Sequence, residues 1–213
     1  MFRNSKELEL SNSQYDRATY INHDLIFSDQ YIEAIKKLGE NKYVTKSIIA
    51  STRAMLTHHH GDKYEDLYFI DTETNKIRKR TDYKKETQKV EPSKSMIKML
   101  KDNPNIVGIH NHPTSAPPSI GDIIVCAERK YKYGLVICHN GTIYQYKVFP
   151  NYNVYRVDSS LNIFSMEEAS LINIIYDKEE LKYRHNKNMS NLIDNLLGVG
   201  VELKEVLWYG ENL

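Results

Sequence analysis

Residues 106–122, with the sequence IVGIHNHPTSAPPSIGD, decide the fold of this chain. An apolar run ends in two histidines, His110 and His112, at positions i and i+2. Residues two apart on a strand point to the same face, so the two imidazoles lie side by side. A proline-rich turn follows, and Ser119 then precedes Asp122 with the spacing of a helix capping box. The pattern predicts a strand, a turn and a helix that bring two histidines and a carboxylate together.

This set of side chains predicts a metal site. Two histidines and one carboxylate, with a fourth position left open for water, are typical of catalytic zinc. Each part also has an ordinary alternative, because paired histidines can be surface residues and Ser-x-x-Asp is a common capping signal. Their order and spacing together favour the metal, so we predict that His110, His112 and Asp122 bind Zn²⁺.

Composition sets limits on the class of protein. The chain has 213 residues, 40% of them hydrophobic and 27% charged, which is typical of a globular protein with a sizeable core. A formal net charge of +1 gives no overall field that would attract nucleic acid, so we do not expect nucleic acid as a partner. No apolar run approaches membrane-spanning length, and residues 1–11 lack the apolar segment of a secretory signal. We therefore expect a cytoplasmic protein that makes no contact with membrane.

Helical and extended patterns alternate along the chain. Apolar spacing predicts helices over 29–38, 42–57, 93–100 and 119–131. Strands are predicted over 64–71, 77–81 and 106–112, and over a hairpin of 135–139 and 142–148 with Asn140-Gly141 at its turn. The composition shifts after Phe149, where we expect an extended, Tyr-rich stretch over 151–158 and helices over 167–183 and 190–197.

This order of elements predicts an α+β protein. We expect a curved, mostly antiparallel sheet that is flanked by helices. Residues 1–60 would form an N-terminal arm and helical lead-in, residues 61–149 the core, and residues 150–213 a C-terminal helical appendage.

Glu65 is the candidate general base. A zinc hydrolase needs a carboxylate that takes a proton from the attacking water and later gives it to the leaving amine. Glu65 stands at the head of the strand predicted over 64–71. The alternative is a solvated charge at a strand start. Asp66 is a rival, but side chains alternate along a strand, so only one of this pair can face the metal.

The tract His58-His59-His60 also has two interpretations. A histidine tract can bind metal. We favour a polar helix end, where histidine suits the helix dipole, because a zinc site built on neighbouring loop residues has poor geometry.

The cysteines, the stretch 130–133 and His139 are expected to have structural roles and to take no part in binding. Cys126 lies one turn after Asp122 and could reach the metal, but a catalytic site keeps an open position, so we expect a buried thiol. Cys126 and Cys138 form no C-x-x-C pair and are expected to stay reduced in an intracellular protein. The stretch Lys130-Tyr131-Lys132-Tyr133 is interpreted as a helix end in preference to a nucleic-acid contact. His139, at the hairpin turn, is expected to face solvent.

The motif His110-x-His112-Pro113 followed by Ser119-x-x-Asp122 resembles that of the JAMM (MPN-plus, Mov34/JAB) metalloproteases. The resemblance implies hydrolysis of a peptide or isopeptide bond with one zinc, held by both histidines and the aspartate. It further implies that Ser119 assists at the oxyanion and that Glu65 is the base. Five residues separate Pro113 from Ser119, one fewer than in the usual pattern of that family.

The resemblance is strongest over about residues 64–148 and is similar to one JAMM subgroup. That subgroup occurs at the C-terminal end of phage minor head (MuF-like) proteins and in related prophage proteins. It is carried by the segments 64–71, 110–113 and 129–136 and by the Asn140-Gly141 hairpin. It implies a JAMM/cytidine-deaminase-like core in a phage- or prophage-encoded protein of the bacterial cytoplasm. The implied partners are a protein or peptide substrate and a phage head or host protein.

Two other classes of function remain open from the sequence. One is a non-catalytic MPN-type protein-interaction module that keeps the fold without the reaction. The other is a phage structural or host-interaction protein, whose contacts would involve the Tyr-rich C-terminal region. The presence of every expected ligand type favours the enzyme over both.

Overall fold

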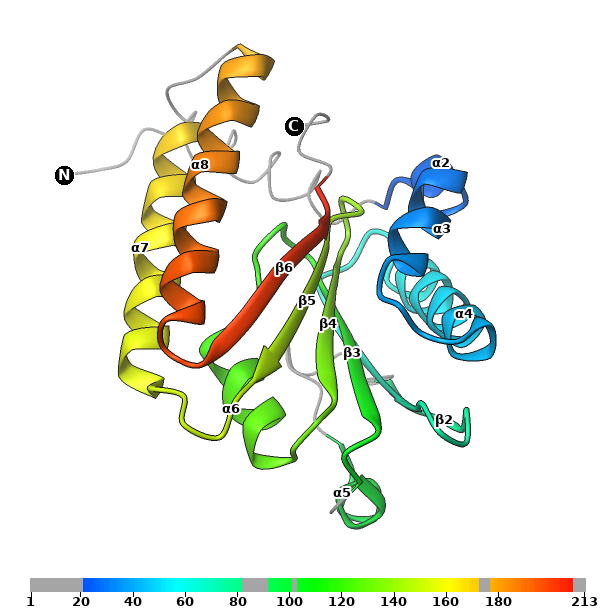
Figure 1. The fold of residues 1–213 in the computed structure, drawn as a ribbon. Coiled ribbons are helices and arrows are strands. Elements are labelled where there is room, and N and C mark those ends of the chain that lie inside the picture. The colour runs from blue at the N-terminus through cyan, green and yellow to red at the C-terminus, as the bar shows by residue number, and fades with distance from the viewer. Residues whose placement is uncertain (1–20, 82–91, 101–102, 173–176, 209–213) are drawn as a thin grey trace, which may run out of the picture.

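A six-stranded sheet forms the centre of the computed structural model, which describes residues 21–81, 92–100, 103–172 and 177–208 (Figure 1). The strands, in order across the sheet, are β2 (Ile77–Thr81), β1 (Asp66–Asp71), β3 (Ile106–His112), β4 (Tyr133–Cys138), β5 (Ile143–Val148) and β6 (Val201–Leu207). Neighbouring strands are antiparallel except β3 and β4, which are parallel.

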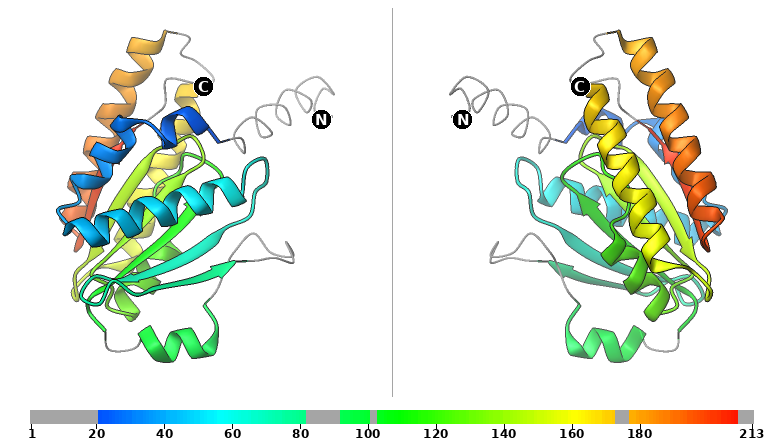
Figure 2. Two further views of the ribbon diagram at one scale, coloured as in Figure 1. Left: turned by 90° about the vertical axis from the view of Figure 1, so that its right-hand side faces the viewer. Right: turned by 90° about the vertical axis from the view of Figure 1, so that its left-hand side faces the viewer.

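Helices cover both faces of this sheet (Figures 1 and 2). One face, called here the α4 face, carries α2 (His23–Ile26), α3 (Asp29–Lys36) and α4 (Lys42–His58). The opposite face, called the α6 face, carries α6 (Ile120–Glu128), α7 (Val154–Ile172) and α8 (Lys178–Leu197). The short helix α5 (Lys94–Leu100) precedes β3, and its Leu100 is buried in the core of the α6 face.

Strand β3 lies inside the sheet, and all seven of its residues are buried. Val107 and Ile109 join the core of the α4 face. Because side chains alternate along a strand, Asn111 follows them to the α4 face, while His110 and His112 point to the α6 face. The central strand therefore delivers different polar groups to the two faces.

The crossover from β3 through α6 to the parallel strand β4 positions the start of α6. Parallel neighbours need such a connection, because a tight turn can join only antiparallel strands. Ser119 is the N-cap of α6, and its hydroxyl accepts a hydrogen bond from the N–H of Asp122. The first turn of α6 thus comes to the end of β3 that carries the two histidines.

The predicted mixture of helices with a mostly antiparallel sheet is confirmed, and the predicted elements from 29 to 148 correspond to α3–α6 and β1–β5. The sheet is open, with β2 and β6 at its two edges. Helices on both faces bury the apolar side chains, so the sheet has no need to close on itself.

The C-terminal region differs from the sequence prediction in three places. The helices predicted over 167–183 and 190–197 have the wrong bounds, because α8 runs unbroken from Lys178 to Leu197. The stretch 151–158 is not extended, since α7 already begins at Val154 and buries Val157, Leu161 and Phe164 along one side. Residues 201–207 form strand β6, which pairs with β5. The segment predicted as a helical appendage therefore also supplies an edge strand to the central sheet. No helix in the described parts of the chain has both the length and the apolar character for crossing a membrane.

His185 joins three elements on the α6 face. Its Nδ1 lies 2.7 Å from Glu168 on α7, and its Nε2 lies 3.0 Å from Glu205 on β6. The ring stacks on Trp208, with centroids 4.4 Å apart. Burial alone would lower the pKa of His185, but the hydrogen bonds and charges of the two glutamates raise it to about 9. The buried imidazolium therefore holds α7, α8 and β6 together.

We expect the protein to lose stability as the pH rises from about 6.5 through about 9. The folded-state pKa of His185 exceeds that of the unfolded chain. The stabilisation is therefore complete below the unfolded value and disappears as the folded group loses its proton, an effect of up to about 3 kcal/mol. His185→Gln should reduce the free energy of unfolding at pH 6 and flatten its dependence on pH in urea titrations. His23→Gln, at an exposed position, is the control; an equal slope in wild type and His185→Gln would contradict the assignment.

Candidate metal centre

The predicted ligands converge at the end of β3. The Nε2 atoms of His110 and His112 lie 3.0 Å apart. His110 Nε2 is 3.2 Å from Asp122 Oδ1, and His112 Nε2 is 3.5 Å from Asp122 Oδ2. Ligand atoms around a tetrahedral zinc with bonds of about 2.0–2.1 Å lie about 3.3 Å from one another. The three side chains thus have the spacing that such an ion requires.

The capping box of α6 orients the carboxylate of Asp122. The hydroxyl and the backbone N–H of Ser119 each donate to Asp122 Oδ2 at 2.7 Å. Both bonds fall on one oxygen, so Oδ1 is directed at His110. Ser119 therefore orients a candidate metal ligand, Asp122, in addition to capping the helix.

The loop between β3 and α6 orients the second histidine. His112 Nδ1 lies 3.1 Å from the carbonyl oxygen of Ala116. A carbonyl only accepts, so Nδ1 carries the proton and Nε2 presents a lone pair toward Asp122.

Electrostatics favours a positive charge at this place. Burial alone would lower the pKa of His110, but the carboxylate of Asp122 and the charge of Glu65 raise it above its ordinary value. Burial would raise the pKa of Asp122, and the two histidines hold it well below its usual range instead. A cation bound between these groups would replace the proton that His110 otherwise attracts.

All five residues predicted from the sequence line one pocket of about 600 Å³. They are Glu65, His110, His112, Ser119 and Asp122. The walls also include Lys63, Leu67, Val125, Arg129, Tyr131 and Tyr146. The pocket therefore combines a polar end at the ligands with apolar and cationic walls.

Two glycines make room for the tyrosines that line the pocket. Gly108 on β3 pairs directly with Gly134 on β4. A Cβ at 108 would lie 3.0 Å from the ring of Tyr131, and a Cβ at 134 would lie 2.1 Å from the ring of Tyr146. The group that Gly108 admits beside the strand is therefore the ring of Tyr131.

Glu65 and Asp66 point to opposite faces, as alternation along the strand requires. Glu65 lines the pocket on the α6 face. Asp66 lies on the α4 face, next to His58 and His59. The structure thus brings Glu65 to the predicted ligands and takes Asp66 away from them.

Asn111 is a site residue that the sequence analysis missed. Its Oδ1 accepts a hydrogen bond from the N–H of Asp66 at 2.7 Å, and its Nδ2 donates to the carbonyl of Tyr64 at 2.9 Å. These two bonds hold the backbone on both sides of Glu65. The prediction that His139 faces solvent is wrong: the residue is 0% exposed, and its Nε2 lies 2.9 Å from Asn111 Nδ2. The buried amide provides the polar partner that lets the ring leave solvent.

The structure confirms that both cysteines are buried and unpaired. Cys126 and Cys138 are buried free cysteines, and burial raises the pKa of the Cys126 thiol to about 12. The stretch 130–133 lies just beyond the end of α6 at Glu128 and leads into β4, with Tyr131 and Tyr133 buried and Lys132 paired with Glu40 at 2.7 Å. It offers no exposed basic-aromatic surface.

Two groups among the described residues could hold a metal ion. One is the predicted set of His110, His112 and Asp122. The other is His58, His59 and Asp66, which the sequence analysis did not bring together. No protein-family model, no curated protein and no solved structure matches this chain. The chemistry of the pocket must therefore be argued from its own residues.

Ser119→Ala should affect both stability and metal affinity. Loss of the N-cap is expected to reduce the free energy of unfolding by about 1 kcal/mol. Because Asp122 also loses the hydroxyl that orients it, the affinity for a divalent cation at this group should fall by roughly 10-fold or more. Ser119→Thr keeps the hydroxyl and serves as control. Denaturant titration and competition with a chelator measure the two effects, and an unchanged affinity in Ser119→Ala would disprove the orienting role.

Proposed function

We propose that this chain is a zinc-dependent metallopeptidase that hydrolyses a peptide or isopeptide bond. The observation that supports it most is the convergence of His110, His112 and Asp122 within 3.5 Å in a pocket that also contains Glu65. Two imidazoles and one carboxylate suit zinc, whereas magnesium and calcium prefer oxygen ligands alone. A zinc ion held by these ligands would lower the pKa of the attacking water and polarise the scissile carbonyl.

Glu65 is the proposed proton carrier. Its carboxylate would accept a proton as the water attacks and would deliver that proton to the leaving amine. Its position just before β1 suits this task, because Asn111 fixes the backbone on both sides while the side chain faces the pocket. The same carboxylate acts as base in the first half of the reaction and as acid in the second.

Ser119 is the proposed donor to the developing oxyanion. Its hydroxyl donates to Asp122, and its backbone N–H donates to the same oxygen. When the hydroxyl rotates toward the pocket during the reaction, the N–H would still hold the carboxylate, by one hydrogen bond in place of two. A donor aimed at a developing oxyanion stabilises the transition state by about 3 kcal/mol.

The walls of the pocket are compatible with a polypeptide substrate. Leu67, Val125 and the two tyrosine rings provide apolar contacts beside the ligands. Lys63 and Arg129 supply positive charge, which suits a substrate with a carboxylate near the cleaved bond. The resemblance to JAMM proteins further supports a phage or prophage origin, action in the bacterial cytoplasm, and a phage head or host protein as partner.

Glu65→Gln should retain metal and lose turnover. The amide keeps the shape of the side chain but cannot carry the proton, so hydrolysis should fall at least about 100-fold. Elemental analysis gives the metal content, and libraries of fluorogenic peptide and isopeptide substrates give the rate. Glu73→Gln, at an exposed carboxylate in the turn after β1, is the matched control. Undiminished hydrolysis by Glu65→Gln would refute the role of base.

A further inference from the structure

We infer that His58, His59 and Asp66 form a second divalent-cation site, on the α4 face of the sheet. It is a structural site that secures the chain on both sides of Glu65. The inference does not depend on the proposed peptidase activity, because it uses other residues on the opposite face.

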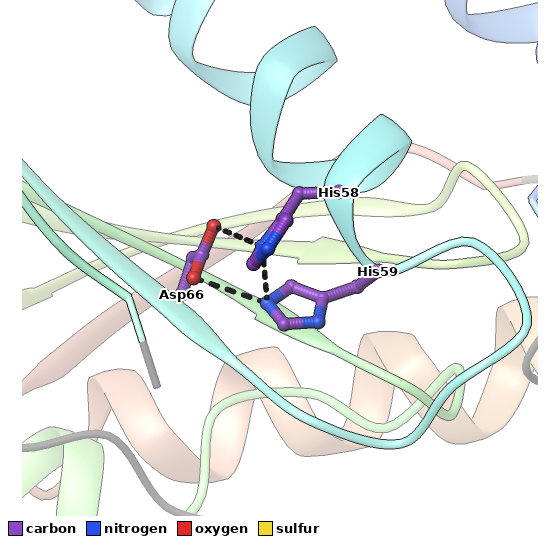
Figure 3. A group of neighbouring side chains, drawn as sticks. All are labelled: His58, His59 and Asp66. Atoms are coloured by element: carbon purple, nitrogen blue, oxygen red, sulfur yellow. Dashed lines mark hydrogen bonds and ion pairs between the residues drawn. The ribbon is translucent and has the colours of Figure 1, made fainter. Parts of the chain in front are cut away.

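The three side chains converge as the predicted ligands of the first site do (Figure 3). His58 Nδ1 lies 3.1 Å from Asp66 Oδ2, and His59 Nε2 lies 3.1 Å from Asp66 Oδ1. His58 Nδ1 and His59 Nε2 are 3.2 Å apart. These separations approach the value of about 3.3 Å between the ligand atoms of a tetrahedral zinc.

The end of helix α4 explains how adjacent histidines can converge. His58 is the last helical residue, and His59 is the C-cap with φ −103° and ψ 19°. The backbone has left the helical conformation at His59, so the second ring turns back toward the first, with ring centroids 4.4 Å apart. The expectation of a polar helix end is correct, and the three ligand atoms nevertheless come together.

Two of the three side chains in this cluster are fully buried, whereas most ion pairs in proteins lie at the surface. Asp66 is 1% exposed and His59 is 0% exposed. Asp66 Oδ1 accepts no hydrogen bond within the described residues, although it lies 3.1 Å from His59 Nε2. A buried carboxylate oxygen without a hydrogen bond is destabilising unless a charge compensates it. A cation between the two atoms would provide that compensation.

A second carboxylate sets the protonation of His59. His59 Nδ1 lies 2.9 Å from Asp62 Oδ1 and donates its proton there, so Nε2 is the nitrogen that would bind a cation placed between it and Asp66. Metal-ligating histidines almost always donate their other N–H in this way. Asp62 and Asp66 together carry two negative charges, which match one divalent cation.

The ligand types and the exposure identify the class of cation. Two nitrogens and a carboxylate suit Zn²⁺ or Co²⁺ and not the oxygen-seeking Mg²⁺ or Ca²⁺. The side chain of His58 is 35% exposed, whereas that of Asp66 is 2% exposed. The ion could therefore enter beside His58 and complete its coordination with water.

The connection to Glu65 runs through the backbone. Asp62 Oδ1 also accepts a hydrogen bond from the N–H of Tyr64 at 2.9 Å, and Asp66 is itself a proposed ligand. A bound cation would fix both neighbours of Glu65 from the α4 face, adding to the two hydrogen bonds of Asn111. The site therefore acts as a positioning element for the pocket on the other face.

Metal stoichiometry of the full chain tests the inference. Stripped protein is dialysed against Zn²⁺ or Co²⁺, and bound metal is counted by elemental analysis. Wild type should bind two equivalents, while His58→Ala and His112→Ala should each bind one and the double variant none. His60→Ala, which removes the neighbouring histidine outside the cluster, should still bind two. His58→Gln is the second variant in case the alanine disturbs the helix end, and circular dichroism confirms folding.

The pattern of losses separates this inference from the proposed function. One equivalent in wild type that is lost in His112→Ala and kept in His58→Ala would overturn the second site. Two equivalents in both His58 variants would overturn it equally. One equivalent that is lost in His58→Ala and kept in His112→Ala would support the second site and refute the proposed peptidase centre.

Discussion

The carboxamide of Asn111 is the interaction on which the rest of the site depends. It is fully buried in the central strand, and it bonds the backbone on both sides of Glu65. A buried amide left without partners would be destabilising, so these bonds are strongly favoured once the strand is in place. They connect β3, which carries the two histidines, with the start of β1, which carries Glu65. The geometry of the pocket is therefore set by polar contacts made on the opposite face of the sheet.

The third ligand depends on the one parallel pair in the sheet. Because β3 and β4 are parallel, the chain must cross over between them, and α6 makes that crossing. The crossing places the first turn of α6 at the end of β3 where the histidines lie. Asp122 then combines two tasks, since one oxygen completes the capping box and the other faces His110. A negative side chain is also favourable in the first turn of a helix, so the cap and the ligand do not compete.

The sequence predicted most of the fold from 29 to 148, because each element there carries a local signal. Capping residues, apolar spacing and the Asn140-Gly141 turn act over a few residues and can be recognised without the fold. Strand β6 lacked such a signal, since an edge strand draws its stability from its partner β5. The predicted ligands and Glu65 were found through spacing on one strand and one helix. Asn111 and the pairing of His58 with Asp66 were missed, because they depend on which face of the sheet each strand presents.

Register decides which of two adjacent carboxylates serves which site. Leu67 pairs with His110 across β1 and β3, so Glu65 lies on the histidine face and Asp66 on the other. A slip of one residue would exchange them, since side chains alternate with a period of two. The hydrogen bond from the N–H of Asp66 to Asn111 opposes that slip, and so do the contacts of Asp66 with His58 and His59. A cation at the second site would strengthen the same constraint. The proposed base is thus held in the pocket by the residue beside it, through contacts that never enter the pocket.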